Sequence, residues 1–284
     1  MQQNPVEFKK RRDFGAIFTD TFVFIGQEFR PLGMSVLYFA FPFILVAAIS
    51  MFLFFHRFMP FFANPEAIIP SGFMKDILFF YFFMIILFLV SKLMFISTIN
   101  NYIALYVEKG RGNFNAADVS HRIGSNFWPM LGTAILAGLM IGIGTLFCFL
   151  PGIYLAVSLS FIYIALIYEK KGFGDALSRT FELSNRQWWW TFLILMVMYI
   201  IITVVLMIPY FIYFAASVGS LVNLNMNHKP DPDQLVAFMK GYSIVLAIII
   251  ILSSLLQAIP WVAMALQYFN LAEMKDKESA DSII

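Results

Sequence analysis

Only one charged residue, Lys92, lies inside a long apolar stretch of the sequence. If that stretch crosses a membrane, a charge there is costly and raises the hypothesis that Lys92 holds a lipid phosphate or another anion between helices. The alternative is that its side chain extends to the interface or pairs with Glu28 or Glu182. Polar residues on the same stretch form an arc about 120° wide on a helical wheel. They are Ser91, Ser97, Thr98 and Asn101. Lys92 points about 100° away from Ser91, so the charge and the arc need not serve one site.

A second polar group precedes Pro260 in the last apolar stretch. It consists of Gln257, Ser253 and Ser254. At this depth such side chains form hydrogen bonds between helices and satisfy the carbonyl that a proline leaves without a donor. Contact of Gln257 with a substrate is the alternative.

Residues with catalytic or metal-binding chemistry are scattered. The three histidines are His56, His121 and His228, and no pair of histidines or carboxylates has the spacing of metal ligands. No Asp or Glu lies centrally in an apolar stretch, where a proton-coupled carrier commonly has one. The sequence therefore predicts no enzyme, no catalytic residue, no metal and no cofactor. His228, Asp231 and Asp233 could contact a cation, although Asp233 also fits a helix cap.

The composition places these residues in a membrane protein. Hydrophobic residues make up 61% of the 284 positions and charged residues 13%, too few polar side chains to cover a water-soluble surface. Crossing about 30 Å of hydrocarbon takes roughly 20 helical residues, and apolar runs of that length recur along the chain. The six predicted spans are 33–55, 77–101, 127–149, 152–168, 189–219 and 242–262.

Basic residues flank the predicted spans unequally. By these boundaries, 14 of the 19 Lys and Arg fall on the side that carries both termini, and four fall on the other. The positive-inside bias predicts that both termini are cytosolic. We expect a multi-pass protein of the bacterial cytoplasmic (inner) membrane. It would have a basic cytosolic N-terminus at 1–13, a single membrane domain at 14–275 and a cytosolic tail at 276–284.

One pattern recurs at the cytosolic ends of the spans. Tyr-Ile-Ala-Leu-Tyr-Val-Glu-Lys at 102–109 returns as Tyr-Ile-Ala-Leu-Ile-Tyr-Glu-Lys at 163–170, and a blurred copy occupies 268–275. We name these three ranges the tyrosine segments. They divide the membrane domain into three predicted hairpin repeats, at about 14–109, 114–170 and 173–275.

Each predicted repeat begins with an amphipathic helix lying in the cytosolic interface. The first and third beginnings share a Phe-Gly start and a Thr-Phe pair at a constant offset of 159. At about 100° per residue, one apolar face gathers on the first helix. Its members are Phe14, Ile17, Phe18, Thr21, Phe22, Ile25 and Phe29. The alternative is a cytosolic helix packed on its neighbours. Asn115 followed by Asp118 predicts the start of the middle helix.

The middle hairpin is predicted to turn at Pro151-Gly152. Ala134, Gly138 and Gly142 are spaced by four, which predicts close approach of a neighbouring helix backbone. The alternative is that these glycines are merely tolerated in a lipid-facing helix. The run 108–112, Glu-Lys-Gly-Arg-Gly, lacks the Lys-Ser/Thr ending of a phosphate-binding loop and predicts a basic turn.

The sequence from 150 onward resembles a known family. The residues that carry the likeness are Leu-Pro-Gly-Ile-Tyr-Leu at 150–155, Glu169, Gly172, Ala176-Leu177, Thr180 and Leu183. The pattern is similar to that of uncharacterised bacterial polytopic membrane proteins related to the membrane domain of some glycerophosphoryl diester phosphodiesterases. The resemblance covers about 114–200, and Thr180 stands where the pattern has Ser. In the fused proteins the phosphodiesterase reaction belongs to a separate soluble barrel, so the resemblance implies no activity for this chain.

The expected fold is therefore an all-α integral membrane protein with six transmembrane helices as three hairpin repeats, each preceded by an amphipathic interfacial helix. We expect a non-enzymatic scaffold or accessory subunit whose basic cytosolic face engages anionic phospholipid or a membrane-protein partner, and no nucleic acid. Its predicted interface anchors are Glu108, Lys109, Glu169, Lys170, Arg179, Arg186 and Trp188. The alternative is a lipid or amphiphile transporter, scramblase-like, with contacts at Lys92, Ser91, Thr98, Asn101 and Gln257 in grooves between hairpins.

Overall fold

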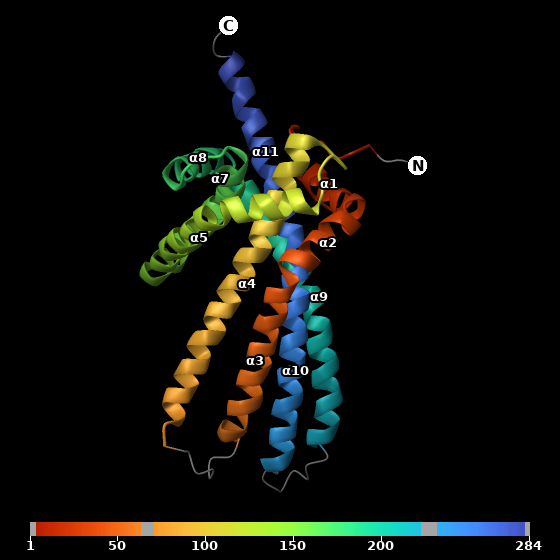
Figure 1. Ribbon diagram of the computed structural model, residues 1–284, viewed down its shortest axis with the longest axis vertical. Helices are drawn as coiled ribbons and strands as arrows, with labels where there is room; N and C mark the ends of the chain where they lie inside the picture. The colour runs from red at the N-terminus through yellow and green to blue at the C-terminus, as the bar shows by residue number, and fades with distance from the viewer. Residues whose placement is uncertain (1–3, 64–70, 223–231, 282–284) are drawn as a thin grey trace. The chain divides into compact units, whose positions relative to one another are not determined.

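The computed structural model describes residues 4–63, 71–222 and 232–281, and its regular elements there are all helices. The α-helices follow one another as α1 (Phe14–Gln27), α2 (Phe29–Phe39), α3 (Phe41–Ala63), α4 (Phe73–Lys109), α5 (Ala116–Phe147), α6 (Phe149–Ser158), α7 (Ile162–Tyr168), α8 (Phe173–Arg186), α9 (Trp188–Val222), α10 (Pro232–Leu256) and α11 (Ala258–Asp281) (Figure 1). A 3-10 turn, η1 (Leu159–Phe161), joins α6 to α7. The predicted all-α class is confirmed.

Six helical segments in the described chain are long and apolar enough to cross a membrane, as expected for a multi-pass membrane protein. They are Phe41–Phe58, Phe73–Lys109, Ala116–Phe147, Phe149–Tyr168, Trp188–Ser217 and Val236–Lys277. The first begins at Phe41 rather than at 33, because α2 ends at Phe39 and Ala40, its C-cap, separates it from α3. The last segment contains a break at Gln257, three residues before Pro260. This break separates α10 from α11.

The middle predicted repeat differs from its expected boundaries. α5 is one continuous helix with Pro129 inside it, so no break separates an interfacial helix from a span. The expected start is confirmed, since Asn115 and Asp118 form a reciprocal capping box. The predicted turn at Pro151-Gly152 is wrong. The chain turns at the extended residue Cys148, and Pro151 lies in the first turn of α6, where a missing N–H leaves no helical bond unmade.

The predicted close approach at Gly138 and Gly142 is also wrong. A Cβ atom added at either position would meet no atom within 4 Å. The close contact lies nearer the turn, where a Cβ at Gly152 would stand 2.9 Å from the Thr145 Cα atom. Because α5 and α6 are joined by the single residue Cys148, their backbones converge at the helix ends rather than along the glycine stripe.

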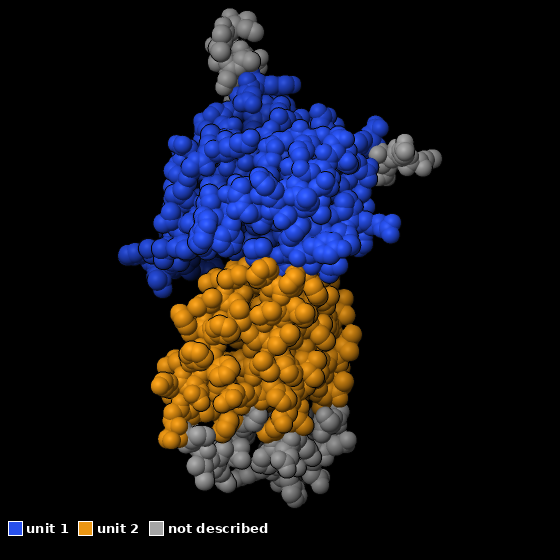
Figure 2. Space-filling model, in the orientation of Figure 1, with its two compact units in different colours: residues 1–40, 93–200, 257–284 blue, residues 41–92, 201–256 orange. Residues whose placement is uncertain are grey.

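The described chain forms two compact units, drawn in separate colours in Figure 2. Unit 2 comprises 41–92 and 201–256, and within it α3 packs along α10 (Figure 1). Small and branched residues of α3, such as Ala47, Ala48 and Ile44, are buried there. The Tyr213 hydroxyl of α9 donates a 2.5 Å hydrogen bond to the Phe238 carbonyl of α10. The α3–α10 pairing thus joins the first predicted repeat to the third.

Unit 1 comprises 1–40, 93–200 and 257–284 and has the tyrosine segments in its core. Residues 102–106, 164–167 and the pair Tyr268 and Leu271 are all buried. The sequence suggested exit marks at an interface for these segments. Their apolar residues form part of the unit 1 core, since all three copies lie in this unit.

Helices α1 and α8 are packed on other helices of unit 1. Both contact α11, and α8 also contacts α6 and α7. α1 buries Ile17, Thr21 and Phe24, whereas Phe22 from its predicted apolar face is 46% exposed. The buried face is therefore rotated from the predicted one, since Phe24 turns toward the core. An interfacial position for either helix stays a prediction.

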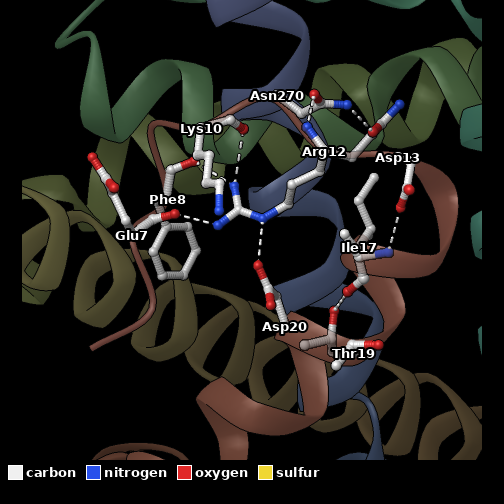
Figure 3. A network of polar contacts seen from close by, with 12 residues as sticks. Glu7, Phe8, Lys10, Arg12, Asp13, Ile17, Thr19, Asp20 and Asn270 are labelled. Carbon is white, nitrogen blue, oxygen red and sulfur yellow. Dashed lines mark hydrogen bonds and ion pairs between the residues drawn. The ribbon is translucent and has the colours of Figure 1, made fainter. Parts of the chain in front are cut away.

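The segment before α1 is built into unit 1. The Arg12 side chain is buried, and its Nε atom donates to Asp20 Oδ2 at 2.8 Å while its Nη1 atom donates to the carbonyls of Phe8 and Lys10 (Figure 3). Its backbone N–H donates to Asn270 Oδ1 at 2.8 Å, which ties the segment to α11. The Arg12 side chain therefore ties the segment before α1 to α1 itself.

Phe8 fixes the same segment to the tyrosine segments. Its ring lies edge-on to Phe24 of α1, Tyr106 of the first segment and Phe269 of the third, with ring centroids 5.0, 5.7 and 5.8 Å apart. The neighbouring Lys9 ammonium lies 5.4 Å from the ring centroid of Tyr168 in the second segment. The predicted basic N-terminus thus reaches all three tyrosine segments.

Candidate functional site

Unit 1 contains a pocket of about 620 Å³ between the α1–α2 corner and the loop that joins α4 to α5. This volume lies in the range of about 300–1,000 Å³ that small-molecule sites occupy. The charged residues among those lining it are Glu28, Arg30 and Arg111. We name this cavity the two-arginine pocket.

Glu28 and Tyr102 form the buried wall of the two-arginine pocket. The Glu28 side chain is 3% exposed, and its Oε2 atom accepts a 2.5 Å hydrogen bond from the Tyr102 hydroxyl. Its Oε1 atom lies 2.7 Å from Arg111 Nε in an ion pair. A buried carboxylate is stable only when it is paired and hydrogen-bonded. The tyrosine and the arginine meet that requirement together.

The α4–α5 loop positions Arg111. Gly110 and Gly112 on either side have φ values of +82° and +74°, a conformation that glycine adopts without strain. The Arg111 Nη2 atom donates to the Gln27 carbonyl at 2.9 Å, which ties the loop to the end of α1. The basic turn predicted for 108–112 is confirmed, and it aims its arginine at the pocket.

Arg30 also lines the pocket, but its contacts differ from those of Arg111. It is exposed and makes no hydrogen bond or ion pair with a described residue. The apolar residues Phe29, Met34 and Tyr38 line the pocket beside it, all exposed on α2. Two arginines and one glutamate give the lining a net charge of +1, next to an apolar wall.

The first predicted anchors form ion pairs between α4 and α5. Glu108 accepts two hydrogen bonds from the Arg122 guanidinium, one of them 2.7 Å from Nη2 to Oε1. Lys109 Nζ lies 2.9 Å from Asp118 Oδ1. The Glu-Lys ending of the first tyrosine segment is thus used to hold the next helix, a role that the sequence did not predict.

Glu169, at the end of the second tyrosine segment, is the centre of a larger network. It accepts hydrogen bonds from Tyr268 of α11 and Arg179 of α8 and forms a 2.5 Å ion pair with Lys171. Burial alone would raise the pKa of Glu169, but the bonds from Lys171, Tyr268 and Arg179 outweigh it and lower the pKa. The carboxylate therefore stays ionised and holds α8 and α11 to the end of α7.

Glu182 extends this network along α8. Its carboxylate pairs with Arg179 and accepts a hydrogen bond from Lys275 of α11, which lowers the pKa of Glu182. Glu28 and Glu182 are the carboxylates that the sequence suggested as partners of Lys92. Glu28 forms an ion pair with Arg111, and Glu182 forms ion pairs with Arg179 and Lys275.

The remaining predicted anchors lie nearer the surface. Lys170 is exposed with a φ of +54° just after α7, and Arg186 is exposed at the end of α8. Trp188 stacks on Tyr154 and Phe192, with ring centroids 5.7 and 5.4 Å apart. Contact of these side chains with a membrane interface stays a prediction.

The structure does not gather the predicted intramembrane contacts into one site. Ser91 and Lys92 belong to unit 2, and Thr98, Asn101 and Gln257 belong to unit 1. The Lys92 ammonium lies 5.2 Å from the ring centroid of Phe88. The hydroxyls of Ser91 and Thr98 donate to backbone carbonyls of their own helix.

Asn101 is a member of this group whose side chain joins two helices, α4 and α5. Its side-chain oxygen accepts a 2.7 Å hydrogen bond from the Asn126 amide of α5. The two residues lie one helical turn or less from buried Thr98 and Ile123. A member of the polar arc therefore takes part in hydrogen bonding between helices, which the sequence predicted for the Gln257 group rather than for the arc.

A second, apolar cavity of about 380 Å³ lies elsewhere in unit 1. Its wall includes Ala134, Ala137 and Gly138 of α5, together with Tyr163 and Trp261. The small-residue stripe that the sequence associated with tight helix packing therefore borders open space.

The sequence indicated neither Glu28 and Tyr102 as a pair nor Arg30 and Arg111 as pocket residues. One signal was available, because Tyr102 and Tyr268 occupy the same position in two tyrosine segments and both donate to a glutamate. Among the residues that the structure describes, no group of three His, Cys, Asp or Glu side chains could hold a metal ion. His228 and Asp231 lie outside the described residues.

The chain matches no protein-family model, no curated protein and no solved structure. The resemblance to the membrane domain of phosphodiesterase-related proteins therefore stays a prediction.

Proposed function

We propose that the protein is a non-enzymatic membrane scaffold or accessory subunit that engages anionic lipid or a membrane-protein partner at its cytosolic face. The observation that carries this proposal is the two-arginine pocket, where an arginine without an ion pair in the described chain stands beside an apolar wall. Arginine recognises phosphate well because its planar fork can donate two hydrogen bonds at once.

The charged networks support a scaffold. Glu108, Glu169 and Glu182 each pair with cations from a neighbouring helix, so these groups hold helix ends together. Partly buried charges in fixed networks keep a surface in one arrangement, which suits a platform for other molecules.

The three-hairpin organisation is part of the same proposal. The first and third tyrosine segments each donate a tyrosine hydroxyl to a glutamate that an arginine also binds, Glu28 with Arg111 and Glu169 with Arg179. Such repetition of a contact among tyrosine, glutamate and arginine supports descent from one repeated unit.

We propose the bacterial cytoplasmic membrane as the location, with both termini and the Glu-Lys ends of the tyrosine segments on the cytosolic side. In a Cys148→Ser background, a cysteine at Ser120 on α5 is expected to resist an impermeant thiol reagent added outside the cell. A cysteine at Ser71, in the loop before α4, is expected to react. The reverse labelling pattern would overturn the orientation. Serine positions are used because the nearby Gly72 and Gly112 have positive φ values that would strain a cysteine.

Purification from native membranes in a gentle detergent tests the scaffold function. We expect a stoichiometric protein partner, anionic phospholipid, or both to be recovered with the protein. Clean isolation with neither would contradict the proposal.

Passage of a lipid or amphiphile is a second candidate, favoured by the apolar cavity of about 380 Å³ in unit 1. Reconstituted vesicles should then show lipid movement that is sensitive to substitution of Gln257 or Lys92. Wild-type protein with no activity above empty liposomes would exclude it.

A further inference from the structure

We propose that the two-arginine pocket binds one phosphodiester headgroup of an anionic phospholipid, with Arg30 and Arg111 on the phosphate and the α2 wall against the start of the acyl chains. This inference rests on the proposed function and names the ligand of that site. The shared chemistry is the phosphate group, which a free phosphate also carries.

Both arginines have donors to offer. Arg111 uses Nε for Glu28 and one N–H of Nη2 for the Gln27 carbonyl, so its Nη1 atom makes no bond to a described residue. Arg30 makes none at all within the described chain. A guanidinium held at one end by a buried carboxylate is oriented before the ligand arrives, which lowers the entropy cost of binding.

Glu28 does not oppose an anion here, because Arg111 compensates its charge and Tyr102 takes its other oxygen. The charge that remains for a ligand is the +1 of Arg30. A phosphodiester carries a single negative charge and matches it. A second phosphate group would add a charge that the described lining does not balance.

Two further features fit a lipid rather than a free ion. Phe29 is 71% exposed, and Met34 and Tyr38 continue the apolar lining along α2. Eight residues separate Arg30 from Tyr38, about 12 Å along a helix at about 1.5 Å per residue. The Gln27 Oε1 atom is buried without a hydrogen bond, so it is an acceptor for a hydroxyl on the headgroup.

The test measures binding of short-chain lipids to the detergent-solubilised full chain. The probes are dihexanoyl phosphatidylglycerol, dihexanoyl phosphatidylcholine and inorganic phosphate. Arg30→Gln is the main variant, because Arg30 has no described partner and its removal leaves the fold intact. Arg111→Gln is secondary, since it leaves Glu28 buried without its cation. Arg11→Gln is the matched control: an exposed basic residue outside the pocket.

We expect wild type and Arg11→Gln to bind phosphatidylglycerol alike and Arg30→Gln to bind it about tenfold more weakly, the scale of one lost charge-assisted hydrogen bond. Arg30→Lys should fall between them, because it keeps the charge and loses the bidentate geometry. Phosphatidylcholine should bind more weakly than phosphatidylglycerol to wild type.

The arms separate the two phosphate sources. Weak binding of inorganic phosphate supports a lipid headgroup, whereas Arg30-dependent binding of inorganic phosphate as tight as that of the lipid reassigns the pocket to a soluble phosphate and overturns the lipid assignment. Equal phosphatidylglycerol binding by wild type and Arg30→Gln overturns the site itself. If anionic lipid still co-purifies in that case, the proposed function survives without this pocket; if nothing co-purifies, the proposed function fails independently.

Discussion

Phe8 should determine whether the N-terminal segment stays attached to the core of unit 1. Its ring is 2% exposed and makes edge-on contacts with three aromatic rings from three different parts of the chain. Replacing a buried phenylalanine by alanine costs about 3–5 kcal/mol. Each aromatic pair contributes about 0.5–1.5 kcal/mol beyond the effect of the buried area. Because Phe8 makes three such pairs, we expect its replacement by alanine to cost an amount within the range of about 3–5 kcal/mol.

Hydrogen exchange at the backbone amides of residues 6–12, in detergent micelles, measures this cost as a local opening. A change of about 1.4 kcal/mol is tenfold in an equilibrium constant. Phe8→Ala should therefore raise the exchange rate by more than about a hundredfold. Phe22→Ala, an exposed phenylalanine on α1, is the control and should change exchange by less than about threefold, since surface substitutions stay within about 0.5 kcal/mol. Equal effects of the two substitutions would refute the packing of Phe8 at the tyrosine segments.

Three further substitutions test the rest of unit 1. Gly152→Ala should destabilise the protein by about 1–3 kcal/mol in denaturant unfolding because the added Cβ collides with α5. Gly142→Ala should be neutral or stabilising by up to about 1 kcal/mol. A larger loss of stability for Gly142→Ala than for Gly152→Ala would contradict the described turn. Arg12→Met should destabilise by at least about 2 kcal/mol, because carbonyls and a carboxylate lose a buried donor, and an unchanged unfolding midpoint would argue against the network in Figure 3. The lowered pKa of Glu182 predicts that its pair with Lys275 stabilises the fold above the ordinary glutamate pKa and that this contribution is lost as the pH falls through the lowered value. The free energies of unfolding of wild type and Glu182→Gln should therefore converge at low pH. A difference that stays constant across the pH range would exclude the ion pair as its source.

The sequence predicted the elements whose signals are local. Apolar runs located six membrane-length helices, because their length and composition are set by the chain alone. The capping box at Asn115 and Asp118 was likewise found from two residues three apart. The basic turn around Arg111 was found from its glycines.

Features that depend on distant contacts were missed. Nothing local shows that Phe8 reaches two of the tyrosine segments or that α3 packs along α10. The Gly138 stripe was misjudged because a spacing of four residues defines a helix face without showing what lies opposite it. The two-arginine pocket requires Arg30 and Arg111, eighty-one positions apart, to line one cavity with Glu28, which follows from the fold of unit 1 rather than from a motif.

Native mass spectrometry of the protein released from bilayers of equal phosphatidylglycerol and phosphatidylcholine tests the lipid-binding role most directly. The structure predicts that wild type retains one phosphatidylglycerol molecule in preference to phosphatidylcholine and that Arg30→Gln loses this preference while Arg11→Gln keeps it. Retention of both lipids in the bilayer ratio by wild type would contradict an anionic-lipid site in unit 1.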